Sequence, residues 1–223
     1  METEANVMRK EMKITLPLYK VAYAICFIVI LSLIRGVTST YEVGIALEAP
    51  IAMLTAVCCA DTYVQEITSK RAEVQRLYPM GKRIHSLIKR LIIQAVFLLV
   101  LAAIGYGLFF VFQNPFIRSE SEEKQFGLYL VAIIVTILFW ALLSNTCSCF
   151  FRNMWAGIGC CLVLWIFTNS SFGDQYLGSW NFFSYTFRNI EQEDYQWLFG
   201  KILCIILCAI MMLLLPKILK KRG

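Results

Sequence analysis

The sequence predicts an all-α protein that crosses a membrane several times. Of its 223 residues, 59% are apolar and only 16% are charged, whereas a soluble domain has about 45–50% apolar and about 25% charged residues. Sixteen Phe, ten Tyr and five Trp argue against a disordered chain, because disorder requires few aromatic residues. The uncharged runs at 91–117 and 125–151 are each long enough for a tilted transmembrane helix, which needs about twenty residues.

Six segments are apolar enough to form transmembrane helices. They are expected at about residues 17–37, 43–63, 91–112, 127–150, 154–170 and 196–216. The first, second and sixth each contain one charged residue, namely Lys20, Glu48 and Lys201. Lys20 lies near the end of its segment, so its ammonium group is expected to reach the interface. The chain is interpreted as a single transmembrane domain, residues 1–223.

Basic residues distinguish the two sides of this six-helix arrangement. An even number of spans places both termini on one side, and that side receives most of the 21 Lys and Arg residues but fewer than half of the 15 Asp and Glu residues. Loops rich in Lys and Arg remain in the cytoplasm. Both termini are therefore expected to be cytoplasmic, in a multi-pass protein of the cell (plasma) membrane. The net charge of +6 then requires no nucleic acid to explain it.

Three segments outside the spans are long enough to have a role of their own. Residues 1–15 are polar with interspersed apolar side chains, which predicts a short helix on the inner leaflet. Residues 64–90 are cytoplasmic, basic and helical in composition. Residues 171–195 are external and include the uncharged run QYLGSWNFFSYTF, which is too short to span the bilayer.

The external segment is unusually aromatic. Its aromatic residues are Phe172, Tyr176, Trp180, Phe182, Phe183, Tyr185 and Phe187. Aromatic rings favour the headgroup region, and Gly173 and Gly178 would permit tight turns. The pattern predicts a re-entrant hairpin or a pair of short helices that closes the outer mouth, with Trp180, Phe182 and Phe183 as gate residues. A passive interfacial anchor is the alternative.

Glu48 and Lys201 are the charged residues deepest in the expected spans, and two interpretations remain open. Both side chains could snorkel to the outer interface. Alternatively, they pair across a helix interface, or Glu48 lines an outward cavity. In either of these last arrangements they belong to the pathway through the bundle.

The residue inventory argues against an enzyme. The nine cysteines lie in or at the ends of the expected spans, where they are expected to pack as small apolar residues. His85 is the only histidine and lies among basic residues, so neither a catalytic pair nor a metal site is predicted. The pair Gly81-Lys82 lacks the upstream glycine of a phosphate-binding loop. No cofactor or metal is expected in this chain.

Segment 64–90 carries the most specific pattern. Glu66 precedes the stretch SKRAEVQRL, in which Ser69 can cap a short helix and Glu73 lies near its positive end. The sequence Tyr78-Pro79 then ends that helix. A basic stretch with apolar Ile84, Leu87 and Ile88 at helical spacing leads into the third span. An ordinary basic loop attracted to anionic lipid is the simpler interpretation.

This order of elements resembles the permease subunit of type-2 ABC exporters. In that family an acidic residue follows the second span, a short coupling helix comes next, and a proline and basic residues precede the third span. Glu66, the SKRAEVQRL helix, Pro79 and Lys82-Arg83 match this pattern, while Ser69-Lys70-Arg71 replaces the usual Gly-Thr. The resemblance covers the whole chain in architecture and about twenty-five residues in motif.

The resemblance implies a subunit of an ATP-driven exporter. Two permeases, identical or sister copies, would form the pathway, and separate ATPase subunits would bind ATP and Mg. Contacts to the ATPase would involve Glu66, Ser69, Arg71, Glu73, Arg76 and Pro79. A peptide or amphipathic antimicrobial is the expected substrate class.

A second class of function remains open. The chain could be a six-span secondary carrier, a channel or a membrane scaffold without an ATPase partner. A carrier is expected to have several buried ionisable groups or broken helices near the midplane. The charge-free segments 91–112 and 127–150 argue against that alternative.

Overall fold

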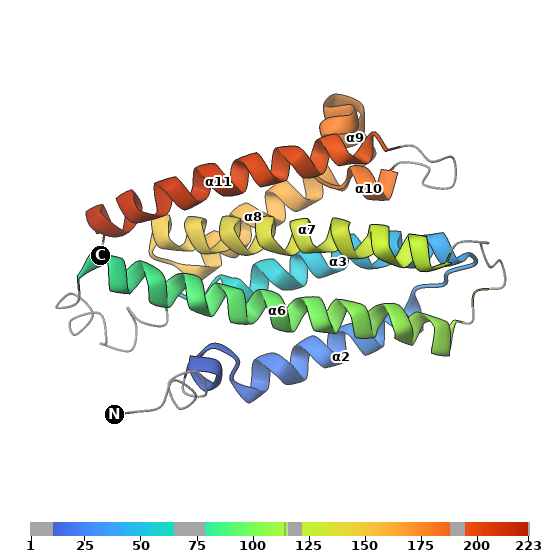
Figure 1. The fold of residues 1–223 in the computed structure, drawn as a ribbon, viewed down its shortest axis with the longest axis horizontal. Coiled ribbons are helices and arrows are strands. Elements are labelled where there is room, and N and C mark those ends of the chain that lie inside the picture. The colour runs from blue at the N-terminus through green and yellow to red at the C-terminus, as the bar shows by residue number, and fades with distance from the viewer. Residues whose placement is uncertain (1–10, 65–78, 114, 116–121, 188–194, 223) are drawn as a thin grey trace.

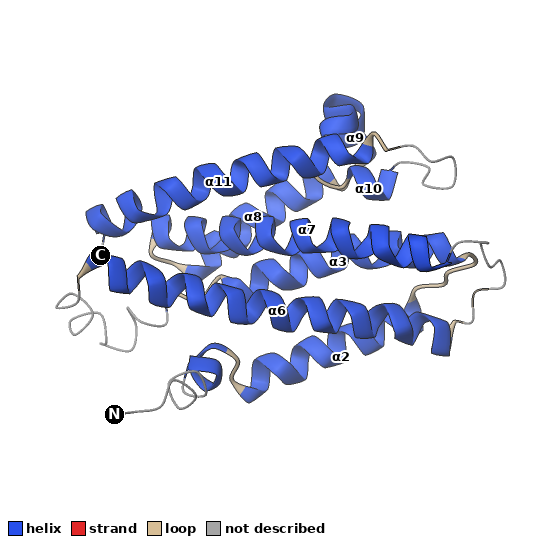
Figure 2. Cartoon of the chain, in the orientation of Figure 1, coloured by secondary structure: helices blue, strands red, loops and turns tan. Residues whose placement is uncertain are grey.

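The computed structural model describes residues 11–64, 79–113, 115, 122–187 and 195–222, and the regular elements in this part are all helices (Figure 2). The long ones are α2 (Leu18–Ile34), α3 (Thr40–Cys59), α6 (Met80–Phe112), α7 (Glu122–Phe151), α8 (Met154–Thr168) and α11 (Trp197–Arg222). Between α8 and α11 come α9 (Ser171–Leu177), the 3-10 turn η1 (Gly178–Trp180) and α10 (Ser184–Phe187). The all-α class predicted from the sequence is confirmed for these residues.

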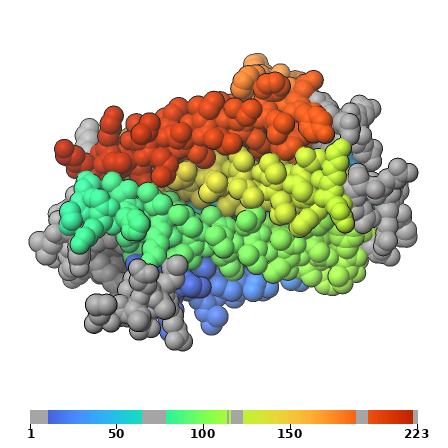
Figure 3. Space-filling model, in the orientation of Figure 1, coloured from blue at the N-terminus to red at the C-terminus, as the bar shows by residue number. Residues whose placement is uncertain are grey.

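The long helices run side by side along the long axis of the molecule (Figure 1). Helix α7 lies at the centre, where it packs against α3, α6, α8 and α11. Helix α2 packs on α6 at one edge of the bundle. Figure 3 shows one broad face on which α7 lies between α6 and α11.

Four helices are long and apolar enough to cross a membrane, namely α3, α6, α7 and α11. Helix α8 and the following α9–η1 segment pass the same criteria together, with a bend of 78° between them, and would make a fifth span. Helix α2 is apolar but has 17 residues. The chain is therefore a multi-pass helical membrane protein.

Helix α3 is the most buried of the four spans and α11 is the least buried. The buried face of α3 is rich in small side chains such as Ala46, Ala52 and Ala56, which let neighbouring helices approach closely. The exposed residues of α6, α7 and α11 include many large aliphatic side chains. In a membrane protein this outer surface contacts lipid.

Helix α6 begins well before the expected third span. It starts at Met80, with Pro79 as its N-cap residue, so residues 80–90 are one continuous helix with the apolar run that follows. Leu87 and Leu91 are buried on one face of this extension, while Lys82 and His85 are exposed on another. This amphipathic pattern stabilises the extension, because its apolar face packs on the bundle while its charged face stays exposed.

The segment after α8 forms a compact cap of short helices, residues 171–187. Helix α9 starts at the N-cap Ser170, whose hydroxyl accepts a hydrogen bond from the Gly173 amide. Gly178 follows α9 with a φ of 52°, a left-handed conformation that favours glycine. The cap packs on the first turns of α11 and the first half of α3, at one end of the bundle (Figure 1).

Candidate functional site

A buried ion pair lies where the cap meets the bundle. Glu48 is in the middle of α3 and is completely buried, and Lys201 is in the second turn of α11 and is 2% exposed. Their side chains form a salt bridge between Lys201 Nζ and Glu48 Oε1. Of the two interpretations left open by the sequence, the structure therefore has the residues paired, and neither side chain extends to an interface.

Every N–H of the Lys201 ammonium group has an acceptor. Besides Glu48, it donates to Thr136 Oγ1 at 2.8 Å and to the Phe182 carbonyl oxygen at 2.9 Å. An ammonium group has three donors, so its hydrogen-bonding capacity is filled within the protein. One acceptor comes from α3, one from α7 and one from the cap, and Lys201 thereby joins three parts of the fold to α11.

The Glu48 carboxylate is equally well surrounded. Its Oε1 lies 3.0 Å from Thr136 Oγ1, and its Oε2 accepts a hydrogen bond from Thr186 Oγ1 in α10 at 2.7 Å. A buried charge is tolerated only when it is paired and hydrogen-bonded. The two threonines and Lys201 meet that requirement, so Glu48 joins the middle of α3 to both α7 and the cap.

The cap is also attached by uncharged contacts. Asn181 Nδ2 donates to the Thr168 carbonyl oxygen at 2.9 Å, and Ser184 Oγ donates to the Trp197 carbonyl oxygen at 2.8 Å. Gly200, next to Lys201, lies so close to the cap that a Cβ at this position would be 2.0 Å from the Asn181 carbonyl oxygen. Only glycine permits this approach of α11 to the cap.

The three predicted gate aromatics occupy different positions. Phe183 is fully buried and stacks on Trp140 of α7, with ring centroids 5.7 Å apart. Phe182 packs on Phe139 at 4.8 Å. Trp180 is 50% exposed and contacts Phe199 of α11 at 5.6 Å. The cap is thus anchored by Phe182 and Phe183, whereas Trp180 lies on its surface.

A second buried ion pair lies just beyond the C-terminal end of α3. Lys20 of α2 is 2% exposed, and its Nζ donates to Asp61 Oδ1 at 2.5 Å and to the Cys58 carbonyl oxygen at 3.0 Å. The Lys20 ammonium group is therefore paired within the protein with an acidic residue next to the end of α3. Asp61 lies two residues beyond the end of α3 and gives the ammonium group a charged acceptor.

Uncharged polar groups extend this second network to α6. Gln94 Nε2 donates to the Cys58 carbonyl oxygen at 3.2 Å, and Thr62 Oγ1 donates to Gln94 Oε1 at 2.9 Å. Nearby, Arg90 Nε donates to Glu11 Oε2 at 2.7 Å. The start of the described chain, α2, the end of α3 and the first half of α6 are therefore held together by hydrogen bonds.

Most of the predicted ATPase-coupling residues lie outside the described residues. These are Glu66, Ser69, Arg71, Glu73 and Arg76. Pro79, the sixth of them, is exposed at the start of α6, as are Lys82 and His85 in the turns that follow.

The cysteines show no arrangement for chemistry in the described part of the chain. All nine are free thiols, five of them buried. No group of three or more Cys, His, Asp or Glu residues there could hold a metal ion. The thiols pack among apolar side chains, and Cys58 accepts or donates one hydrogen bond with Tyr23 at 3.1 Å.

Sequence reasoning missed the partners of the two ion pairs. Thr136 and Thr186 are unremarkable in apolar segments, and Asp61 and Gln94 are at the edges of expected spans. A usable signal was nonetheless present, because a polar residue in the middle of a span faces the bundle interior.

The chain matches no protein-family model, no curated protein and no solved structure. Fold and site together define the class, a helical multi-pass membrane protein whose described residues include two buried ion pairs.

Proposed function

We propose that this chain is the permease subunit of a type-2 ABC exporter. The observation that carries the proposal is the cap of short helices between α8 and α11, attached to the core through Lys201 and Glu48. A permease needs a structured closure at one mouth of its bundle that is linked to the helices that move. The cap has a direct connection to α3, α7 and α11.

The proposal includes six spans, with α2 as the first and α8 as the fifth. The 17 residues of α2 rise about 25 Å, close to the thickness of a hydrocarbon core, and α8 would complete its span with its bent continuation. Both termini and residues 64–90 would then be cytoplasmic, and the cap external, in accordance with the distribution of Lys and Arg.

In this proposal the chain itself hydrolyses no ATP. Two copies, or this chain and a sister permease, would form the pathway, and separate ATPase subunits would bind ATP and Mg. The segment containing Glu66, Ser69, Arg71, Glu73 and Arg76 would contact the ATPase between the end of α3 and the start of α6. Closure of the ATPase pair would shift the population of permease conformations through differential contacts at this segment.

Peptides or amphipathic antimicrobials remain the proposed substrate class. The apolar interior and the aromatic cap suit a substrate with an apolar face. The two buried ion pairs have their charges paired within the protein, so the specificity is proposed to depend mainly on shape and apolar contact.

The test is a charge reversal in the coupling segment. Arg71→Glu with Arg76→Glu should leave the permease inserted while it abolishes stimulation of the co-purified ATPase and export of a fluorescent cationic amphipathic peptide, because it reverses charge at a protein contact. Lys13→Glu with Arg35→Glu makes the same change of charge elsewhere and is the matched control. Wild-type ATPase stimulation and export in the Arg71/Arg76 variant would contradict the proposal.

A secondary carrier is the second candidate, and one observation favours it. The interior contains two buried ion pairs and a helix bent by 78°, which are features of carriers. Such a carrier would accumulate the same peptide in proteoliposomes under a pH gradient with no ATPase present. An exporter subunit purified alone would show no accumulation.

A further inference from the structure

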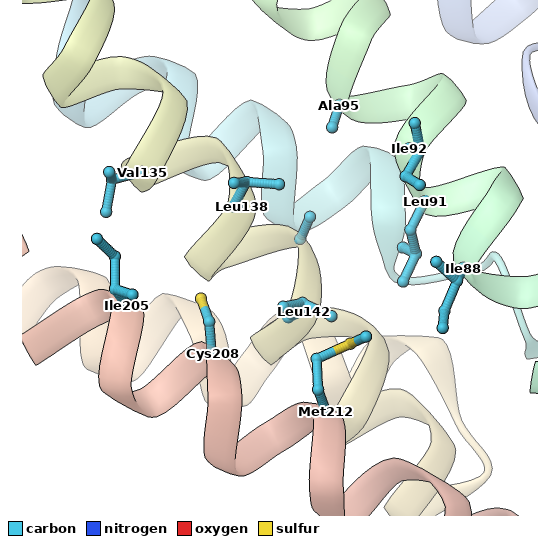
Figure 4. A pocket seen from close by; sticks show the side chains of 11 residues that line it. Ile88, Leu91, Ile92, Ala95, Val135, Leu138, Leu142, Ile205, Cys208 and Met212 are labelled. Carbon is cyan, nitrogen blue, oxygen red and sulfur yellow. The ribbon is translucent and has the colours of Figure 1, made fainter.

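An apolar groove runs along the face where α7 lies between α6 and α11. Its volume is about 290 Å³, and its lining is entirely apolar, including Ile88, Ile92 and Ala95 of α6, Leu138 of α7, and Ile205 and Met212 of α11 (Figure 4). A second hollow of about 170 Å³ continues it between α6 and α7 and shares Ile92, Ala95 and Leu138. The groove faces the membrane, because its walls are three of the helices that can span one.

The dimensions of the groove suit one acyl chain. Along α6 the lining extends from Ile88 to Leu99, which is a rise of about 16 Å. One leaflet contributes half of a hydrocarbon core of about 30 Å. An acyl chain in the groove would therefore be covered along its length, with its headgroup beyond Ile88.

Basic side chains lie where that headgroup would be. His85 and Lys89 precede Ile92 and Val96 on one stripe of α6, at helical spacing, and Lys82 lies one heptad before Lys89 on the same side. Lys82 and His85 are exposed and Lys89 is half-buried. The apolar groove and the positive end form one continuous surface.

From this surface we infer that the groove between α6, α7 and α11 binds an anionic phospholipid. Its acyl chain lies along α6, against Ala95 of α6 and Leu138 of α7, and its phosphate contacts Lys82 and Lys89. Zwitterionic lipids fill the groove more weakly because they have no net charge to complement the two lysines. A second copy of the chain is the competing occupant.

The experiment is native mass spectrometry of the purified full chain, titrated with phosphatidylglycerol or with phosphatidylcholine of identical acyl chains. The wild type should retain phosphatidylglycerol preferentially. Lys82→Gln with Lys89→Gln should weaken its binding by roughly 25-fold, since each basic side chain near an anionic surface contributes about fivefold. Lys13→Gln with Arg35→Gln removes the same charge from exposed sites elsewhere and should have no such effect.

A groove-filling variant tests the acyl chain separately. Leu138→Trp should weaken binding of both lipids, whereas Val163→Trp adds the same bulk to an exposed position of α8 and should weaken neither. Equal retention of the two lipids by the wild type, or unchanged binding in Leu138→Trp, would overturn the inference. So would loss of dimers in Leu138→Trp with lipid binding intact, because the groove would then be a subunit contact.

Discussion

One buried ion pair lies at the middle of α3 and the other just beyond its C-terminal end, and the two differ in how completely the protein encloses them. Glu48 and Lys201 have side chains exposed by 0% and 3%, and Lys201 has all three donors filled. Lys20 and Asp61 have side chains exposed by 3% and 12%. The two acidic residues are thirteen positions apart on the chain, about 20 Å along a helix.

The difference in enclosure reflects what each pair connects. The first pair joins the cap to three spans in the interior, where no water can replace a lost partner. The second pair joins α2 to the end of α3, immediately before the segment proposed to contact an ATPase. A fully enclosed pair fixes one arrangement of the helices, whereas a pair at the edge of the bundle can exchange partners with water at a lower cost.

The largest effect on stability is expected when one partner of the Glu48–Lys201 pair is removed. Lys201→Met should lower the free energy of unfolding by about 3–5 kcal/mol, because it leaves Glu48 buried without a counter-charge. Adding Glu48→Leu to Lys201→Met should restore most of that loss. The measurement is thermal unfolding of the detergent-purified protein, monitored by size-exclusion chromatography.

The exposed Lys217 is the control for this experiment, and Lys217→Met should change the stability by less than about 0.5 kcal/mol. If Glu48→Leu with Lys201→Met is as unstable as Lys201→Met alone, then hydrogen bonds to the threonines and the Phe182 carbonyl group contribute more to stability than the pairing of charges.

A smaller effect is expected from the contact between α11 and the cap. Gly200→Ala should destabilise the protein by about 1–3 kcal/mol, because its Cβ would be 2.0 Å from the Asn181 carbonyl oxygen. Gly159→Ala in α8 is the matched control, since a Cβ there meets no atom within 4 Å. Equal melting temperatures for the two variants would mean that the cap can move away from α11 without loss.

The smallest effect is expected for salt screening of the interaction between Lys20 and Asp61. A double-mutant cycle with Lys20→Met and Asp61→Asn should give a coupling energy of about 1–2 kcal/mol at low salt, and high salt should reduce it by a few tenths of a kcal/mol, because this pair is partly accessible to ions. The corresponding cycle on Glu48 and Lys201 should not respond to salt. The same salt response in both cycles would remove the distinction between the two regions.

The sequence alone determined that this protein is a helical membrane protein, because an apolar content of 59% leaves no other environment for its surface. It also pointed to Glu48 and Lys201, since charge inside an apolar segment is costly wherever it occurs. For residues 171–187 the length and the aromatic residues predicted either a re-entrant hairpin or a pair of short helices, and the structure has the short elements α9, η1 and α10 there.

Only the tertiary structure decided which polar groups meet. Lys201 is 153 positions from Glu48 along the chain, and Lys20 is 41 positions from Asp61, so no local pattern specifies either pair. Snorkelling of Lys20 can be predicted from one helix alone, whereas its pairing with Asp61 depends on the packing of two segments. The same reason explains why Thr136, Thr186 and Gln94 were missed: a lone polar side chain in a span indicates that it faces inward, and only the packed bundle shows what it faces.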